Sequence, residues 1–227
     1  MDSTNDLALE WLRQGAQSGA VIVADEQIKG RGRLGRTWYT PPGTALIVSI
    51  ILRPTRDHIS QLTMLGAVAI AELLEHVGAA DIGIKWPNDV QLGGRKVSGI
   101  LPEVVWNGTD VEGAVLGMGI NVRIDFSGTP LEGAAISIES ALGTSVDRLN
   151  LLVYLLNRVG HWTTKLGTRS LFDAWRERLT TLGKTVSYTN GTGIAKDVDE
   201  DGALLVKALD GATHRLIAGD IVLGSVL

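Results

Sequence analysis

The stretch "IGIKWPNDVQLGGRKVSGILPEVVW", residues 82–106, decides the fold class of this chain. Its apolar and β-branched runs are separated by "WPND" and "GG", which predicts three consecutive strands joined by short turns. Pro87 favours an extended conformation at Trp86, and Asn88 and Asp89 can bond their own backbone in a turn. Because long helical patterns flank this segment, the sequence predicts an α+β fold, a mixed β-sheet with flanking helices.

Helical and strand patterns continue on both sides of this stretch. Leu7, Trp11 and Leu12 recur at helical spacing near the start of the chain, and Gly15 supplies a stop signal. The same patterns predict helices at 3–15, 59–78, 147–166 and 170–183, and strands at 20–27, 44–54 and 112–124.

After Gly183 the pattern changes to short β-like runs. Turn signals such as "NGTG", "DEDG" and "LDGA" separate the runs, which is typical of a small β-barrel. Residues 183–227 hold four Lys/Arg and six Asp/Glu, a net charge of 4 − 6 = −2, which disfavours nucleic-acid binding by this part. We therefore predict two domains, residues 1–182 and residues 183–227.

The composition excludes several classes of protein. With 227 residues, of which 44% are apolar and 20% charged, the chain can fold around a core of its own. The absence of cysteine rules out disulfides and thiolate chemistry, and a net charge of −4 argues against general nucleic-acid affinity. The apolar run at 45–51 is far shorter than the ~20 residues of a membrane span, and a polar "MDSTND" opens the chain. We expect a cytoplasmic protein with no DNA and no membrane as partner.

Against this acidic background, the loop "EQIKGRGRLGRTWYTPPG", residues 26–43, gathers positive charge. Four cations and three glycines fall within residues 29–36. Glycine permits close approach of the backbone to a ligand, and arginine suits phosphate or carboxylate groups. The glycine spacing matches neither a Walker loop nor a Rossmann fingerprint. Taken by itself, the loop is compatible with a solvated basic turn, a nucleic-acid patch or a clamp for nucleotide phosphates.

Two further features allow both a structural and a functional interpretation. Lys85 follows Ile82 and Ile84 on a predicted strand, and a buried lysine needs an anion beside it. The structural alternative is a surface hairpin that carries an isolated lysine. The "STN" segment, residues 3–5, either caps the first helix together with Asp6 or presents short polar groups to a ligand.

Taken together, these features resemble one family. The motifs "DSTND", "EQIKGRGRLGRTW", "KWPNDVQLGGRKVSGIL" and "GMGINV" occur in the order and spacing of biotin protein ligases, also called biotin–[acetyl-CoA-carboxylase] ligases. The segments "GKTV", "GIAKDVDEDGALLV" and "GDIVLG" are similar to the small terminal barrel of that family. The resemblance implies a catalytic domain of the class II synthetase type followed by a Src-homology-3-like barrel. It also implies the monofunctional form, without the N-terminal DNA-binding domain of the longer members.

The resemblance implies a two-step, ATP-dependent reaction. Biotin and ATP form biotinyl-5′-AMP and pyrophosphate, and the adenylate then acylates one lysine of a biotin carboxyl carrier protein. Mg²⁺ is expected on the ATP phosphates, so no metal-ligating residue is predicted. Homodimers occur in this family, and the oligomeric state of this chain stays open.

The resemblance also assigns residues to the parts of the substrates. The biotin site is expected to consist of Ser3, Thr4, Asn5, Gln27, Arg31, Gly32, Arg33 and Lys85. The nucleotide site is expected to consist of Arg31, Arg33, Trp38, Lys85 and Asn121. The catalytic cations in this assignment are Lys85, Arg31 and Arg33.

Some positions depart from the family pattern, and two rival functions stay open. The chain begins almost on its biotin motif, Leu34 and the pair Ile28–Lys29 are unusual in the loop, and Pro102 predicts a bulge or a sheet edge. A lipoate or octanoate transferase shares the catalytic fold but carries a different arginine-rich motif. A nucleic-acid-binding module would explain the arginines, but neither the hairpin at Lys85 nor the acidic charge.

Overall fold

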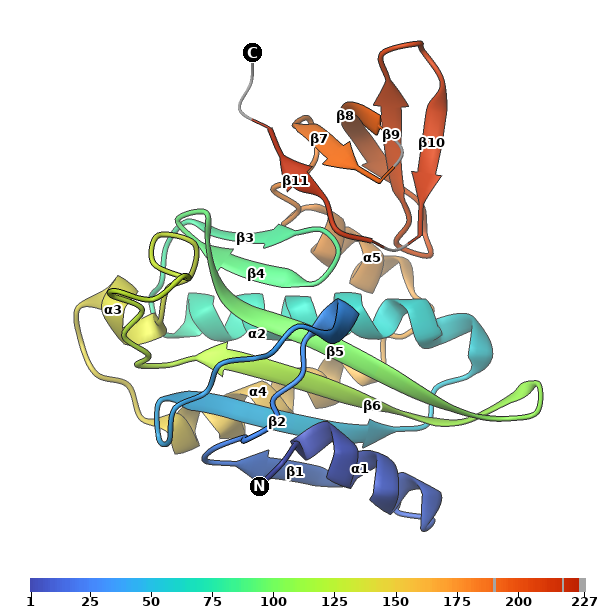
Figure 1. Ribbon diagram of the computed structural model, residues 1–227. Helices are drawn as coiled ribbons and strands as arrows, with labels where there is room; N and C mark the ends of the chain where they lie inside the picture. Colours follow the sequence, from blue (N-terminus) through green and yellow to red (C-terminus); the bar gives the residue numbers. More distant parts are fainter. Residues whose placement is uncertain (190, 218, 225–227) are drawn as a thin grey trace.

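The larger of two β-sheets organises the molecule (Figure 1). The computed structural model describes residues 1–189, 191–217 and 219–224. The larger sheet has six strands in the order β1-β2-β6-β5-β4-β3. These strands are β1 (Val21–Ala24), β2 (Ala45–Leu52), β3 (Ile82–Lys85), β4 (Asp89–Leu92), β5 (Arg95–Asn107) and β6 (Asp110–Asn121). The mixed sheet expected from the sequence has antiparallel ladders throughout its described strands, and parallel pairing is confined to isolated bridges.

The three strands expected in residues 82–106 are confirmed as β3, β4 and β5. The strand β5 pairs with β6 from Ser98 to Asn107, whereas its pairing with β4 ends at Gly99. Pro102 therefore lies where β5 has a single neighbouring strand, which suits a residue without a backbone N–H. The irregularities in the pairing lie elsewhere in the sheet, so the edge expected at Pro102 is present and the bulge is not.

Helices cover both faces of this sheet. They are α1 (Thr4–Arg13), α2 (Leu62–His76), α3 (Ile138–Leu142), α4 (Arg148–Thr163) and α5 (Arg169–Arg176), with 3-10 turns η1 (Arg33–Gly35) and η2 (Arg56–Gln61). The helices α2 and α4 pack against each other on one face, and α1 lies on the other face beside β1 (Figure 1). The short helix α3 was not predicted, because five residues are too few to show a helical period.

The first helix begins and ends as its sequence predicts. The Ser3 hydroxyl accepts a hydrogen bond from the Asp6 backbone N–H at 3.4 Å, and Gly15 follows the helix with a φ of 88°. The buried stripe of α1 runs through Ala8 and Leu12, which pack against β1, β2 and β6. Trp11, expected on this face, is 40% exposed because it lies one residue, about 100° of helical rotation, away from the stripe.

The strand β6 presents a different kind of surface on each of its faces. Its even-numbered positions from residue 114 to residue 120, among them Leu116, Met118 and Ile120, join the core under α2. On the opposite face, Val115 packs against α1, and Gly117 and Gly119 follow it at two-residue spacing. This face therefore has side-chain packing at one end and bare backbone at the other.

The C-terminal part forms a separate five-stranded sheet in the order β10-β9-β8-β7-β11. Its strands are β7 (Thr185–Tyr188), β8 (Gly191–Val198), β9 (Leu204–Ala208), β10 (Thr213–Leu216) and β11 (Val222–Leu223). The end of the last predicted run, residues 225–227, lies outside the described residues. The predicted domain boundary after residue 182 falls between α5 and β7.

The two sheets are joined by a continuous core. Val198 and Leu204 of the smaller sheet belong to the same buried cluster as Trp175 on α5. The Trp86 indole N–H donates to the Gly202 carbonyl oxygen at 2.8 Å. At the surface of this interface, both oxygens of Asp197 accept hydrogen bonds from Arg176, at 2.8 and 3.1 Å.

The ion pair between Arg176 and Asp197 predicts a pH-dependent contribution to stability. Hydrogen bonding by Arg176 lowers the pKa of Asp197, against the opposing effect of burial. Because this pKa is lower in the folded state, the pair stabilises the fold above the unfolded value of ~3.9, and the contribution disappears as the pH falls through the folded value. Since the pair is partly exposed, we expect Asp197→Asn to lower the free energy of unfolding at pH 7 by ~0.2–1 kcal/mol.

Urea unfolding at pH 7 and at stepwise lower pH measures this effect. Asp57→Asn, which alters an exposed carboxylate on η2, is the matched control. The difference between Asp197→Asn and wild type should shrink as the pH falls below ~4. A difference that stays constant with pH would contradict the ion-pair explanation.

Candidate functional site

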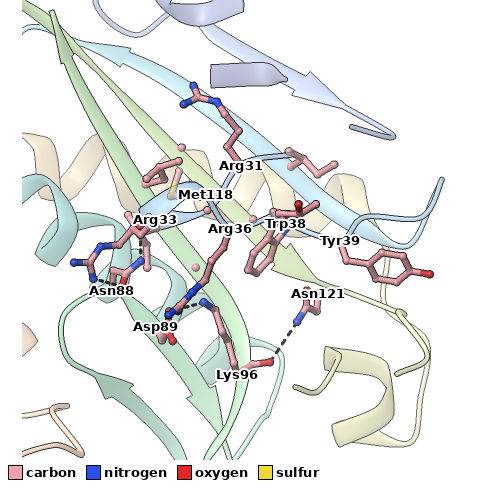
Figure 2. Close-up of a pocket in the computed structure, with 18 of the residues that line it drawn as sticks. Arg31, Arg33, Arg36, Trp38, Tyr39, Asn88, Asp89, Lys96, Met118 and Asn121 are labelled. Carbon is pink, nitrogen blue, oxygen red and sulfur yellow. Dashed lines mark hydrogen bonds and ion pairs between the residues drawn. The ribbon is translucent and has the colours of Figure 1, made fainter. Parts of the chain in front are cut away.

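A cavity of about 310 Å³ lies between the basic loop and the bare face of the larger sheet. Its walls are the start of α1, the loop between β1 and β2, the strands β5 and β6, and parts of the segment 126–135. Figure 2 shows the loop side chains on one side of this cavity and residues of β4, β5 and β6 on the other. The volume is within the range of small-molecule sites.

Two glycines of β6 form the floor of the cavity because they carry no side chain. A Cβ atom at Gly117 would lie 2.3 Å from Asn5 Oδ1, and one at Gly119 would lie 2.6 Å from Trp38 Nε1. Both distances are shorter than van der Waals contact allows. The motif "GMGINV" therefore lets an amide and an indole lie directly on the sheet.

At one end of the cavity, neutral side chains form a hydrogen-bonded network. Gln27 Oε1 accepts hydrogen bonds from the backbone N–H and the hydroxyl of Thr4, at 2.7 and 3.0 Å. Ser49 Oγ, on β2, lies 2.8 Å from Thr4 Oγ1 and 2.6 Å from Asn5 Oδ1. Thr4, Asn5 and Ser49 are all buried. Such a network suits the neutral donors and acceptors of a polar ligand.

The basic loop is itself a narrow hairpin. The backbone N–H of Trp38 donates to the Gly30 carbonyl oxygen at 2.9 Å, and the backbone N–H of Gly32 donates to the Arg36 carbonyl oxygen at 2.7 Å. At Gly30 the two arms approach so closely that a Cβ would lie 2.5 Å from the Trp38 carbonyl oxygen. Leu34 is at the tip in η1, with a φ of 55° and 72% of its surface exposed.

The first two cations of the loop are bound by carboxylates of the protein itself. Lys29 Nζ lies 2.7 Å from a carboxylate oxygen of Asp2. Arg31 donates to both oxygens of Glu103, at 3.1 and 2.8 Å, and to Asp6 at 2.6 Å. Burial disfavours the charge on Arg31, but Glu103 and Asp6 outweigh it, so the pKa of the Arg31 guanidinium is raised above its ordinary value. Arg31 is predicted to bind phosphate, so the carboxylates of Glu103 and Asp6 compete with a ligand phosphate for its guanidinium.

Arg33 and Arg36 extend away from Arg31, toward Asn88 and Asp89 (Figure 2). Arg33 donates to Asn88 Oδ1 at 2.9 Å and to the Gly219 carbonyl oxygen at 3.3 Å. Arg36 pairs with Asp220, just before β11. In the described part of the chain, Arg33 is the one loop cation whose hydrogen-bond partners are all neutral. Its charge is the least compensated of the four.

Lys96 on β5, rather than Lys85 on β3, lines the cavity. Lys96 Nζ lies 2.6 Å from Asp89 Oδ1 and 5.3 Å from the centre of the Trp38 ring. Lys85 is half-buried on β3 and pairs with Asp89 only in the backbone register. The tight turn between β4 and β5 brings the lysine of "GRKVSG" to the cavity, which a comparison of motif positions did not reveal. The location predicted for Lys85 is corrected accordingly.

Trp38 and Asn121 lie deeper in the same cavity. The Trp38 indole rests on Gly119, and its N–H is buried with no hydrogen-bond partner among the described residues. Asn121 donates to the Lys96 and Ile136 carbonyl oxygens, at 3.3 and 3.2 Å (Figure 2). Asn121 thus holds the segment after β6 against the strand that carries Lys96.

All the predicted site residues except Lys85 line the cavity. The cavity lining also includes residues that the sequence interpretation did not select, among them Arg36, Asn88, Asp89, Lys96, Phe126 and Asp220. Most of the added residues lie inside the quoted motifs. The motifs therefore contained the site residues, but the sequence interpretation did not select all of them. Phe126 comes from a segment without a recognisable pattern, whereas Asp220 lies in "GDIVLG", which the sequence interpretation assigned to the terminal barrel. Only the chain path brings these two residues to the cavity.

Neither a metal cluster nor a membrane helix is found in the described ranges. Among residues 1–189, 191–217 and 219–224, no three His, Cys, Asp or Glu side chains are grouped in a way that could hold a metal ion. In the same ranges, no helix has the length and apolar character that crossing a bilayer requires.

Comparison with known proteins assigns the family. Residues 1–121 match the model of the biotin/lipoate A/B protein ligase family, and residues 178–224 match the biotin protein ligase C-terminal domain. The biotin–[acetyl-CoA-carboxylase] ligase of Paracoccus denitrificans is 34% identical over 224 residues, which are 91% of this chain and 91% of the relative. The chain belongs to the biotin protein ligase family.

Other biotin protein ligases agree with this assignment. The bifunctional ligase/repressor BirA of Bacillus subtilis is 32% identical over 236 residues, covering 99% of this chain and 72% of that protein. The structure of the biotin protein ligase from Aquifex aeolicus in complex with biotin and ATP is similar with a TM-score of 0.83 and 28% identity, over 99% of this chain and 96% of that chain. The predicted family, the α+β fold with its small C-terminal β domain and the class of ATP-dependent biotin ligase are confirmed.

The glycine floor of this biotin protein ligase predicts an unequal response to two glycine substitutions. Gly117→Ala forces a methyl group against Asn5, so we expect it to lower the free energy of unfolding by ~1–3 kcal/mol. Gly160→Ala, in α4, meets no atom within 4 Å and should raise the free energy of unfolding by up to ~1 kcal/mol. Urea unfolding of both variants measures the difference. Equal effects would mean that Asn5 does not lie on Gly117.

Proposed function

We propose that this protein joins biotin to ATP as biotinyl-5′-AMP, and then transfers the biotinyl group to a lysine of a biotin carboxyl carrier protein. The observation that carries the proposal is the composition of one cavity. A neutral hydrogen-bonding network lies at one end, and the weakly compensated Arg33 lies together with Lys96 at the other. This polarity matches a ligand with a neutral polar ring and an anionic tail.

The neutral end suits the ureido ring of biotin. That ring has two N–H donors and one strong acceptor, and each polar group left unpaired on burial costs ~1–3 kcal/mol. Thr4, Asn5 and Gln27 line the cavity with short polar groups, without a charge that would have to be desolvated, and the buried Ser49 hydroxyl holds Thr4 and Asn5 from behind. These side chains therefore recognise the ring at low cost in solvation.

The charged end suits the first chemical step. An oxygen of the biotin carboxylate bonds to the α-phosphorus of ATP while the bond to the pyrophosphate oxygen breaks, and pyrophosphate leaves with that electron pair. The carboxylate is already ionised at pH 7, since its ordinary pKa is ~4.3, so this step needs no general base. It needs cations that bring two anions together and stabilise charge on the phosphoryl oxygens. We assign this role to Lys96 and Arg33, and Lys96 takes the position first given to Lys85.

The adenine moiety has a proposed place beside Trp38. The buried indole N–H of Trp38 is a donor that a ligand acceptor can satisfy, and an aromatic face can stack on a base. Asn121 fixes the neighbouring backbone of Lys96 and of the segment at Ile136. This proposal puts the base next to the cation that holds the phosphate.

Mg²⁺ fits this site as a companion of the ATP phosphates. It prefers oxygen ligands and retains several waters, so it requires few protein groups. Asn88 and Asp89 offer side-chain oxygens at the charged end of the cavity. When bound, the ion would neutralise part of the triphosphate charge, while Lys96 and Arg33 hold the reacting groups.

The second step requires loss of a proton from the acceptor. The lysine ammonium of the carrier protein, with an ordinary pKa of ~10.4, gives up one proton to solvent, and the neutral amine bonds to the acyl carbon of the adenylate. The acyl C–O bond breaks, AMP leaves with that electron pair, and the second amine proton passes to solvent. Enclosure of the mixed anhydride by the loop hairpin limits its hydrolysis until the acceptor arrives. We expect the acceptor to be the carrier protein or domain of a biotin-dependent carboxylase.

Adenylate formation from α-labelled ATP tests the proposal without an acceptor protein. Wild type is supplied with Mg²⁺ and either biotin or lipoate, and biotin-dependent acyl-AMP is the expected product. Activity with lipoate and none with biotin would overturn the substrate assignment. No acyl-AMP with either acid would overturn the activity.

Two lysine variants test which cation serves the reaction. Lys96→Gln should lower the rate of adenylate formation by about 10²–10³-fold, because it removes a charge next to the reacting groups. Lys85→Gln should remain within a few-fold of wild type, since Lys85 does not line the cavity. The opposite ranking would return the role to Lys85.

A further inference from the structure

Glu103 lies next to the cavity without lining it, and it touches both Asn5, which the proposed function uses, and Arg31 of the basic loop. One of its oxygens accepts a hydrogen bond from Asn5 Nδ2 at 2.7 Å. Both of its oxygens accept hydrogen bonds from Arg31, at 3.1 and 2.8 Å. Its side chain is 24% exposed, and it stands on β5 just beyond Pro102, where β5 has a single neighbouring strand. One carboxylate thus connects the polar network to the basic loop.

The contact with Glu103 determines which way the Asn5 amide faces. An ionised carboxylate only accepts hydrogen bonds, so the amide must turn its NH₂ group toward Glu103. Nδ2 also donates to the Leu101 carbonyl oxygen at 3.2 Å, which uses both of its hydrogens. The amide oxygen then faces Ser49 Oγ at 2.6 Å and lies on Gly117. A reversed amide would bring two acceptors together at 2.7 Å.

Arg31 makes the Glu103 carboxylate a firm partner for Asn5. Its guanidinium binds Glu103 through two nitrogens and also binds Asp6 at 2.6 Å, so two carboxylates share one cation. A bidentate arginine–carboxylate pair fixes direction as well as distance. Asp6 follows Asn5 in α1, so the same guanidinium holds the loop against the helix that carries the amide.

The network therefore holds the segment 27–31 at both ends. At one end, Gln27 is bound by Thr4, and at the other end Arg31 is bound by Glu103. Ser49 and Asn5 connect these two ends across the cavity floor. Any change that turns the Asn5 amide also disturbs the anchor of the loop.

We propose that Glu103 is a positioning residue, which orients the Asn5 amide for the biotin ring and anchors the glycine–arginine loop through Arg31. The inference rests on the proposed function, since biotin is the ligand that Asn5 is taken to meet. If Glu103 had a merely structural role, its replacement would lower stability and change the KM for biotin and the KM for ATP equally. A positioning role affects biotin selectively and loosens the loop.

The test compares Glu103→Gln with wild type and with Asp110→Asn, an exposed carboxylate change in the same hairpin. Adenylate formation gives KM for biotin and for ATP separately, and trypsin gives the cleavage rate after Arg31 in the presence of biotin. Glu103→Gln should raise KM for biotin about tenfold or more, because it weakens a charge-assisted hydrogen bond. KM for ATP should change less than about twofold, and cleavage after Arg31 should be several-fold faster. Asp110→Asn should match wild type in all three.

A double variant keeps the proposal falsifiable if Glu103→Gln folds poorly. Asn5→Asp places two carboxylates together and should abolish biotin binding. In the double variant Asn5→Asp with Glu103→Gln, the new amide donates to the new carboxylate, so one hydrogen bond is restored with donor and acceptor exchanged. The double variant should therefore recover part of the biotin binding. An unchanged KM for biotin in Glu103→Gln, equal rises for biotin and ATP, or no recovery in the double variant would overturn the inference. Wild type that forms no biotinyl adenylate would instead overturn the proposed function.

Discussion

The close contact between the Asn5 side chain and the bare backbone of Gly117 is the constraint on which the rest of the site depends. It requires a glycine on the cavity face of β6, and it requires α1 to begin directly above that strand. Packing of Ala8 and Leu12 against β1, β2 and β6 holds α1 in this place. The apolar part of the helix thus positions its polar first turn, and the cavity floor follows from both.

Compensation of charge explains how an acidic protein holds a concentrated basic loop. Lys29 and Arg31 are bound by internal carboxylates, so they fix the start of the hairpin rather than attract a distant anion. Arg33 is bound by an amide oxygen and a carbonyl oxygen, and exchange of such neutral partners for a phosphate costs less than separation of an ion pair. Four similar cations therefore acquire different tasks from their surroundings.

The C-terminal sheet contributes to the site as well as to the core. Arg33 and Arg36 both reach the segment that precedes β11, through Gly219 and Asp220. The same sheet is fixed to the part of the chain that carries the larger sheet, by buried contacts and by the hydrogen bond from Trp86 to Gly202. A shift of the small sheet would therefore be transmitted to the loop over the cavity.

The sequence by itself determined the order of the elements and the class of the site. The period of the apolar residues predicts the long helices, the strands flanked by turn signals and the change of pattern after Gly183, because these are local properties of the chain. The resemblance of its motifs to those of biotin protein ligases also predicted that "STN", the basic loop and "GMGINV" belong to one site. Within a motif, however, local patterns carry no information on which face of a strand meets which neighbour.

The tertiary structure decided the choices that depend on register and on chain path. It turned Lys96 rather than Lys85 to the cavity, because the tight turn after β4 fixes which residues of β5 lie beside Asp89. It paired Arg31 with Glu103 and left Arg33 with neutral partners, although both arginines look alike in "GRGR". Such differences arise from distances between residues far apart in the sequence, and only the folded chain defines those distances.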